Sequence, residues 1–224
     1  MMNIPRVPCL VILAVLGFTG CATESHRRLA VEAPAAAARP AAGPRPPVSV
    51  GKFDNRSSFM RGIFSDGVDR LGSQARTLLV THLQQSNRFT VLDRDNLAEA
   101  AQEAEIRNEA RQFKGAIHIV TGDVTEFGRK EVGDRQLFGI IGRGKSQVAY
   151  AKVSLNIVDS RSTEVVYSVQ GAGEYSLSSR EVIGFGSSAG YDSTLNGKVL
   201  DLAIREAVDR LAAALDNGAW KPTP

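Results

Sequence analysis

Cysteine, histidine and excess charge are all scarce in this sequence of 224 residues. Its two cysteines are Cys9 and Cys21, and Cys9 lies in an N-terminal segment that we expect to be removed, so the mature chain can form no internal disulfide. The three histidines, His26, His82 and His118, are scattered and lack the spacing of metal ligands. The sequence therefore predicts neither a disulfide framework nor a metal site.

The charge balance excludes another class of partner. The 27 basic and 24 acidic residues give a net charge of +3, and the two signs are mixed along the chain. No basic stretch with interleaved aromatic residues is present. We therefore expect no nucleic-acid partner.

The N-terminus has the layout of an export signal. Arg6 precedes the apolar run 7–18, which is too short to be a permanent transmembrane helix. Small residues and Cys21 follow, and this resembles the bacterial lipobox, in which the cysteine becomes the acylated first residue of the mature chain. Ala22 rather than an aspartate comes next, which by resemblance to sorted bacterial lipoproteins predicts the outer membrane. Residues 1–20 are thus predicted to be a lipoprotein signal peptide, with an ordinary signal peptide or an uncleaved anchor as alternatives.

Composition divides the mature chain into a linker and a domain. Residues 21–47 are rich in alanine and contain five of the nine prolines, so they predict an extended, lipidated linker without a core of its own. At about 3.1 Å per residue such a linker would hold a domain several nanometres from a lipid anchor. Residues 48–220 are long enough for one domain with a hydrophobic core, and 221–224 form a short tail.

Hydrophobic periodicity predicts an α/β (α+β) fold for this domain. Alternation with a period of two indicates strands, and apolar residues three or four apart indicate helices. The predicted strands are 48–53, 89–94, 116–127, 148–159 and 163–176, and the predicted helices are 68–86, 96–110 and 193–215. Strands that alternate with helices and end in a hairpin predict a mixed β-sheet packed with about three helices.

The stretch FGIIGRGKS contains a GxxxxGK[ST] match, from Gly139 to Ser146. A working phosphate loop lies between a buried strand and the N-terminus of a helix, which together hold the phosphates. Here the preceding residues are polar, and residues 147–159 alternate like a strand. We therefore predict no nucleotide binding.

A second motif, GxSxG at residues 186–190, is that of a nucleophile elbow. That fold places its catalytic histidine after the serine, whereas the last histidine of this chain is His118. No clustered pair of carboxylates stands out either. The sequence predicts a protein that is not an enzyme and has no cofactor.

Two glycine-rich excursions, at about 126–151 and 174–192, extend from the ends of predicted strands. Both have apolar tips, namely Leu137, Phe138, Ile140 and Ile141 in the first and Val182, Ile183 and Phe185 in the second. They are either β-hairpins that enter a membrane, where a strand needs about 9–11 residues, or loops that cover the domain or contact a partner.

The order of several segments resembles a known family, the CsgG/HfaB curli secretion channel lipoproteins. The segment SQARTLLVTHLQQSNRFTVLDRDNL is similar to the family's first helix and second strand. The block from VTGDVTEF through LFGIIGRG to AKVSLNIVDSRSTEVVYSV is similar to its first hairpin and the strands around it. GYDSTLNGKVLDLAIREAVDRL and GAW are similar to its closing helix and the end of the domain.

The resemblance implies a function. Identical subunits would form a ring, each giving two hairpins to a shared outer-membrane β-barrel, through which unfolded subunits of a curli-type amyloid fibre or a holdfast leave without ATP. It implies a homo-oligomer with exported fibre subunits and periplasmic accessory factors as partners, and outer-membrane lipid bound through Cys21. The hairpin tips would lie at or near lipid, and Asn55, Phe59 and Phe64 would belong to the loop that narrows the channel.

A second hypothesis remains open at this stage. The chain could instead be a monomeric periplasmic interaction module on a lipid tether, for example a regulator of peptidoglycan synthesis.

Overall fold

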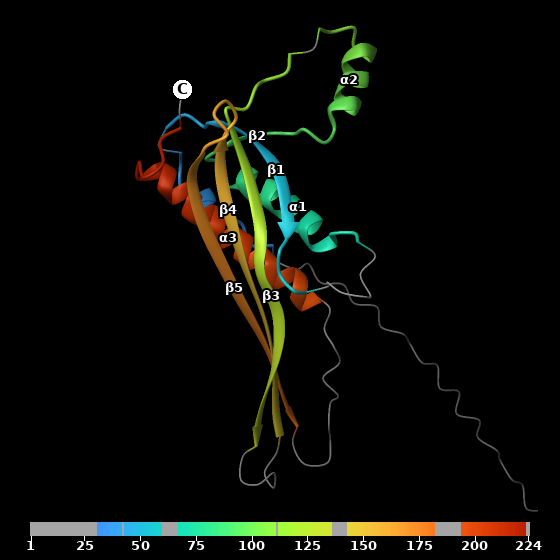
Figure 1. Cartoon of the computed structure of the whole chain (residues 1–224), viewed down its shortest axis with the longest axis vertical. Helices are drawn as coiled ribbons and strands as arrows, with labels where there is room; N and C mark the ends of the chain where they lie inside the picture. The colour runs from blue at the N-terminus through green and yellow to red at the C-terminus, as the bar shows by residue number, and fades with distance from the viewer. Residues whose placement is uncertain are drawn as a thin grey trace, which may run out of the picture. The chain divides into compact units, whose positions relative to one another are not determined.

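A single mixed sheet organises the fold (Figure 1). The computed structural model describes residues 31–41, 43–59, 67–110, 112–135, 143–181 and 194–222. The sheet order is β2–β1–β3–β4–β5, with β1 parallel to β2 and β3, and with β3, β4 and β5 antiparallel to one another. The strands are β1 (Pro47–Asn55), β2 (Thr90–Leu92), β3 (His118–Arg135), β4 (Arg143–Asp159) and β5 (Val165–Glu181). The predicted mixed sheet is confirmed.

In the described part of the chain three α-helices accompany the sheet, as predicted. They are α1 (Arg70–Gln85), α2 (Leu97–Ile106) and α3 (Thr194–Asp216), and a short 3-10 helix, η1 (Ala35–Ala38), precedes β1. Helix α1 packs against β1, α3 packs against β4 and β5, and the two helices contact each other. The core therefore lies between one face of the sheet and the α1–α3 pair.

Local sequence sets both the start of helix α1 and the face that it buries. The Asp69 side chain caps it by accepting a 2.7 Å hydrogen bond from the backbone N–H of Gly72. The helix then repeats a buried apolar residue every four positions, at Leu71, Ala75, Leu79 and Leu83. This spacing keeps all four on the face that meets β1.

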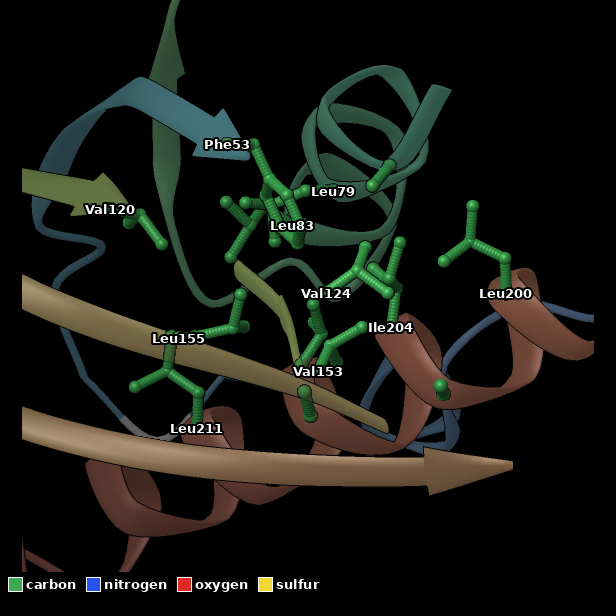
Figure 2. Packing of buried hydrophobic residues seen from close by; sticks show 14 of the residues in the cluster. Phe53, Leu79, Leu83, Val120, Val124, Val153, Leu155, Leu200, Ile204 and Leu211 are labelled. Atoms are coloured by element: carbon green, nitrogen blue, oxygen red, sulfur yellow. The ribbon is translucent and has the colours of Figure 1, made fainter. Parts of the chain in front are cut away.

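The side chains of the two helices meet those of the central strands in one cluster (Figure 2). Figure 2 shows Leu79 and Leu83 of α1 on one side of the cluster, and Ile204 and Leu211 of α3 on the other. Val153 and Leu155 of β4 are fully buried in the same cluster. Each buried leucine or isoleucine contributes roughly 1.5–3 kcal/mol to folding, so this cluster supplies most of the stabilisation.

Two elements are shorter than predicted, because a local turn ends each of them. The backbone N–H of Asp95 donates a 2.8 Å hydrogen bond to the Asp93 carboxylate, and this turn ends β2 at Leu92. Helix α2 ends at Ile106 because Asn108 adopts a positive φ of 55°.

The compact unit begins at Glu32, well before the boundary at residue 48 that composition predicts. Ala36 is buried, and its backbone N–H donates a 3.1 Å hydrogen bond to Asp209 of α3. Glu32 pairs with Arg205 of the same helix. Small alanine side chains let η1 lie against α3, so this part of the predicted linker packs on the domain.

Candidate functional site

Strands β3, β4 and β5 continue together past the part of the sheet that α3 covers (Figure 1). The N-terminal part of α3 marks the end of that cover. There Arg129 of β3 donates a 2.8 Å hydrogen bond to Asn196, and the Lys198 ammonium lies 5.2 Å from the ring centre of Tyr175 on β5. Beyond these contacts, the ladder continues for roughly 20 Å at about 3.3 Å per residue. We call this part, residues 130–135, 143–148 and 176–181, the strand extension.

Cross-strand pairing holds the strand extension together. The β3–β4 ladder runs to Arg135 opposite Arg143, and the β4–β5 ladder runs to Arg143 opposite Glu181. The prediction ended β3 at residue 127 and β5 at residue 176, so both strands are longer than expected. The first excursion is thus partly the continuation of β3 and β4. Its tip, the return strand of the second excursion and the closed barrel stay predictions.

The loop that follows β1 lies at the base of the strand extension. Because β1 runs parallel to β3, its end at Asn55 is paired with Val124. Just beyond it, Phe59 packs on Phe127 of β3 with ring centres 4.6 Å apart and planes at 52°. The loop and the base of the strand extension are therefore one structural unit.

Asn55 organises this loop from inside. It is buried, its side-chain oxygen accepts a 3.0 Å hydrogen bond from the N–H of Ser57, and its Nδ2 donates one of 2.9 Å to the carbonyl oxygen of Phe59. Its own N–H donates to Asp69, the residue that caps α1. Phe64 lies outside the described residues, and the role of the three residues in narrowing a channel stays a prediction.

The face of the sheet opposite α1 and α3 carries a shallow cleft of about 640 Å³ at the base of the strand extension. Its charges are paired across strands, with Lys152 bonded to Glu126 at 2.7 Å and Lys130 lying 3.9 Å from Glu174. These two pairs leave the lining of the cleft without net charge.

Sequence reasoning missed one residue of this face, Tyr150. Its ring covers Gly128, its direct partner in the β3–β4 register, and a Cβ on that glycine would lie 2.6 Å from the tyrosine oxygen. A large aromatic residue opposite a glycine compensates for the missing side chain of the strand. The signal in the sequence was the glycine itself, at a position that otherwise alternates as a strand.

Strand β5 is an edge strand within the described residues, since β4 is its only hydrogen-bonded neighbour there. Val165, Val166 and Tyr175 along it are exposed. An edge strand of this length has a row of backbone N–H and C=O groups that pair readily with another strand.

His118 is a structural residue of the core. It is 1% exposed, and its ring lies edge-on against Trp220 with centres 5.3 Å apart. Neither ring nitrogen has a hydrogen-bond partner among the described residues. Burial lowers the pKa of His118, while the nearby Asp159 carboxylate acts in the opposite direction.

Of the two motifs that resemble enzyme signatures, GxxxxGK[ST] lies partly within the described residues and GxSxG lies outside them. Lys145 and Ser146 lie within β4, so a strand and not a helix follows the phosphate-loop pattern. The GxSxG segment, like Cys21 and the apolar tips, lies outside the described ranges. Those tip residues are Leu137, Phe138, Ile140, Ile141, Val182, Ile183 and Phe185.

Within the described ranges, no helix is both long and apolar enough to cross a bilayer. The same part of the chain contains no group of three or more His, Cys, Asp or Glu side chains placed to hold a metal ion.

The sequence matches a known protein family over most of its length. The family model described as "Curli production assembly/transport component CsgG" matches residues 31–223. The chain belongs to the CsgG family. The match begins beside Glu32, where the compact unit of the structure also begins, so the packed alanine-rich segment is part of the family domain.

One relative is similar to this chain over nearly its whole length. The chain is 66% identical over 209 residues to a protein of Neisseria meningitidis serogroup B named "Putative lipoprotein NMB1126/NMB1164". The alignment covers 93% of this chain and 94% of the relative. This CsgG-family chain therefore has a lipoprotein relative across nearly its whole length.

Solved structures resemble this CsgG-family chain more distantly. A PelC dodecamer from Paraburkholderia phytofirmans is 15% identical, with coverage of 76% of this chain and 91% of PelC and a TM-score of 0.36. The lipoprotein GNA1162 from Neisseria meningitidis is 15% identical, with coverage of 78% and 97% and a TM-score of 0.34. TM-scores below 0.5 transfer neither assembly nor activity to this chain.

Proposed function

We propose that this chain is a non-enzymatic subunit of an outer-membrane export pore. Cys21 carries the lipid anchor, several copies associate, and their strand extensions join into a shared barrel through which fibre subunits pass. The match to the CsgG family over residues 31–223 supports this role.

The observation that carries the proposal is the ladder of β3, β4 and β5, which continues beyond the part of the sheet that α3 covers. Within the described residues the strand extension continues past the helices, whereas the rest of the sheet packs on α3. A ring of copies would give the strand extension a partner, because neighbouring extensions can continue the same ladder. The exposed edge of β5 would then be paired instead of open.

The test is a deletion of residues 132–146 from the full-length lipoprotein. The deletion removes the end of the first hairpin and leaves α1, α3 and the core strands in place. We expect wild-type protein extracted in mild detergent to form large oligomers and to conduct ions in planar bilayers, and we expect the deleted protein to lose conductance. A wild-type protein that is strictly monomeric after native extraction would rule the pore out.

A specific feature of the sequence favours a second candidate. In residues 130–135 charged residues stand at both even and odd positions, Lys130 and Asp134 against Glu131 and Arg135. A strand in contact with lipid needs one continuous apolar side. The second candidate is a lipid-tethered periplasmic interaction module, for example one that regulates peptidoglycan synthesis, in which the strand extension stands in water.

The two candidates differ in one measurement. Cross-linking in cells followed by affinity purification would recover a peptidoglycan-synthesis enzyme if the second candidate is correct. Recovery of large rings of this chain without such an enzyme would leave only the first candidate.

A further inference from the structure

Between β2 and β3 the chain forms an arm that carries α2 and stands apart from the sheet (Figure 1). The base of the arm is closed by a 2.8 Å hydrogen bond from the Arg94 guanidinium to the carbonyl oxygen of Lys114, and Asp95 pairs with Arg76 of α1. Of the α2 residues only Ala104 is buried. Isolated helices shorter than about 12–15 residues are marginal in water, so a ten-residue helix without a packed face is incomplete by itself.

The outward face of α2 combines acidic charge with one large apolar side chain. Glu99, Glu103 and Ile106 are spaced i, i+4 and i+7, which places them on one face, opposite Ala104. Ile106 is 69% exposed, and the helix contains no basic residue. A partner for this face must offer positive charge beside an apolar hollow.

The same chain has a groove of that kind. Two hollows of about 340 and 470 Å³ share Ala41 and Arg45 in their walls. The first also contains Arg39. The second is lined mostly by apolar residues, among them Pro44 and Leu215, and its two remaining charged residues, Arg88 and Asp216, are paired with each other. Arg39 and Arg45 are exposed, and neither has a carboxylate partner among the described residues.

We infer that the Glu99–Glu103–Ile106 face of α2 in one subunit binds the groove at Arg39 and Arg45 of a second copy of this chain. Ile106 would enter the apolar hollow, and the two carboxylates would meet the two guanidinium groups. This inference rests on the self-association proposed above, and it names a contact that holds neighbouring subunits together.

Topology makes the contact possible in a ring. The groove lies where β1 begins, and the arm returns to the sheet at Ile117, where β3 begins beside β1. Arm and groove are therefore at the same end of the sheet, away from the strand extension. In a ring with cyclic symmetry, two different surfaces at equal height can meet between neighbouring subunits in a head-to-tail contact. Among the described residues, none of α2 lines the groove of its own chain.

Site-directed disulfide formation tests the contact in the full-length lipoprotein in mild detergent. One variant carries Ile106→Cys and a second carries Pro44→Cys. Mixing them under mild oxidation is expected to give a covalent heterodimer, at least about tenfold more than in a mixture with the control Ala98→Cys, whose side chain lies on another side of α2. Wild-type chain, which keeps Cys21, measures the background.

Charge reversal gives an independent measurement. Glu99→Lys with Glu103→Lys, or Arg39→Glu with Arg45→Glu, is expected to weaken association by about tenfold, and mixing the two proteins should restore it to within about twofold. Oligomers that form without a cross-link between the cysteines at positions 106 and 44 would overturn this inference but would not affect the proposed pore. A third variant carries Ile106→Cys and Pro44→Cys in one chain, and cross-linking only within that chain would assign the groove to its own arm. The absence of any oligomer would remove both proposals.

Discussion

Gly171 of β5 lies directly against the backbone of Ala203 on α3. A Cβ on this glycine would overlap the carbonyl oxygen of Ala203 and lie 2.8 Å from the Cβ of Ala207. Gly173, two residues along the same face, is in a similar position against Val199. Helix α3 therefore packs on β5 with the two backbones in direct contact, and the base of the strand extension depends on this contact.

Gly171→Val is expected to destabilise the protein by about 3 kcal/mol or more, because neither backbone can move away without opening the core. Urea unfolding can be followed by the fluorescence of Trp220, the only tryptophan and a buried one. Gly43→Val is the matched control, since nothing lies within 4 Å of a Cβ at Gly43. Equal midpoints for the two variants would contradict this account of the helix–strand contact.

His82 of α1 and Asp201 of α3 form the polar link between the two helices, with Nε2 and Oδ1 separated by 2.8 Å. Asp201→Ala leaves the buried histidine without that partner and is expected to cost about 1–3 kcal/mol. Asp201→Asn keeps an acceptor oxygen and should cost clearly less. The free energies of unfolding of the two variants, measured at one pH, check the order.

His118 makes stability depend on pH. Burial lowers its pKa in the folded state below the unfolded value near 6.5, so the unfolded chain binds the proton more readily. Its effect is absent at high pH, and stability falls as the pH drops below about 6.5, by at most about 1.4 kcal/mol per pH unit.

The His118→Gln variant isolates this effect. Unfolding free energies of wild type and variant between pH 8 and pH 5 should diverge in slope below about pH 6.5, with the wild type losing more. Parallel curves would show that protonation of His118 is not the cause. Asp159, whose pKa is lowered by hydrogen bonds from the N–H groups of Ser162 and Arg161, titrates below this window.

Asn55→Ala should loosen the loop at the base of the strand extension. It removes the acceptor for Ser57 and the donor to the Phe59 carbonyl, and we expect a loss of about 1–2 kcal/mol together with faster proteolysis after β1. Ser58→Ala, at an exposed position of the same loop, is the control. Similar cleavage rates in both would mean that Asn55 does not order the loop.

Local patterns predicted the helices and central strands well. The apolar repeat from Leu71 to Leu83 and the alternation from Ala149 to Ile157 each depend on one element and one buried face. Periodicity contains that information directly.

The strand extension could not be predicted in the same way. Residues 128–135 are glycine-rich and charged, which locally indicates a loop. They are strands because they pair with 143–150, and such pairing is a non-local property. The arm was likewise hidden, since Leu97, Ala101 and Ala104 have the spacing of a core-facing helix, yet only Ala104 is buried.

The packing of η1 on α3 also shortens the linker between Cys21 and the folded domain. If acylated Cys21 holds the chain in lipid, only residues 22–31 separate the anchor from the folded body at Glu32. Ten residues can reach at most roughly 30 Å at about 3.1 Å per residue, against roughly 80 Å for a linker that ran unpacked to residue 47. The folded body would then work beside its own membrane and would be too tightly held to search far across the surrounding space.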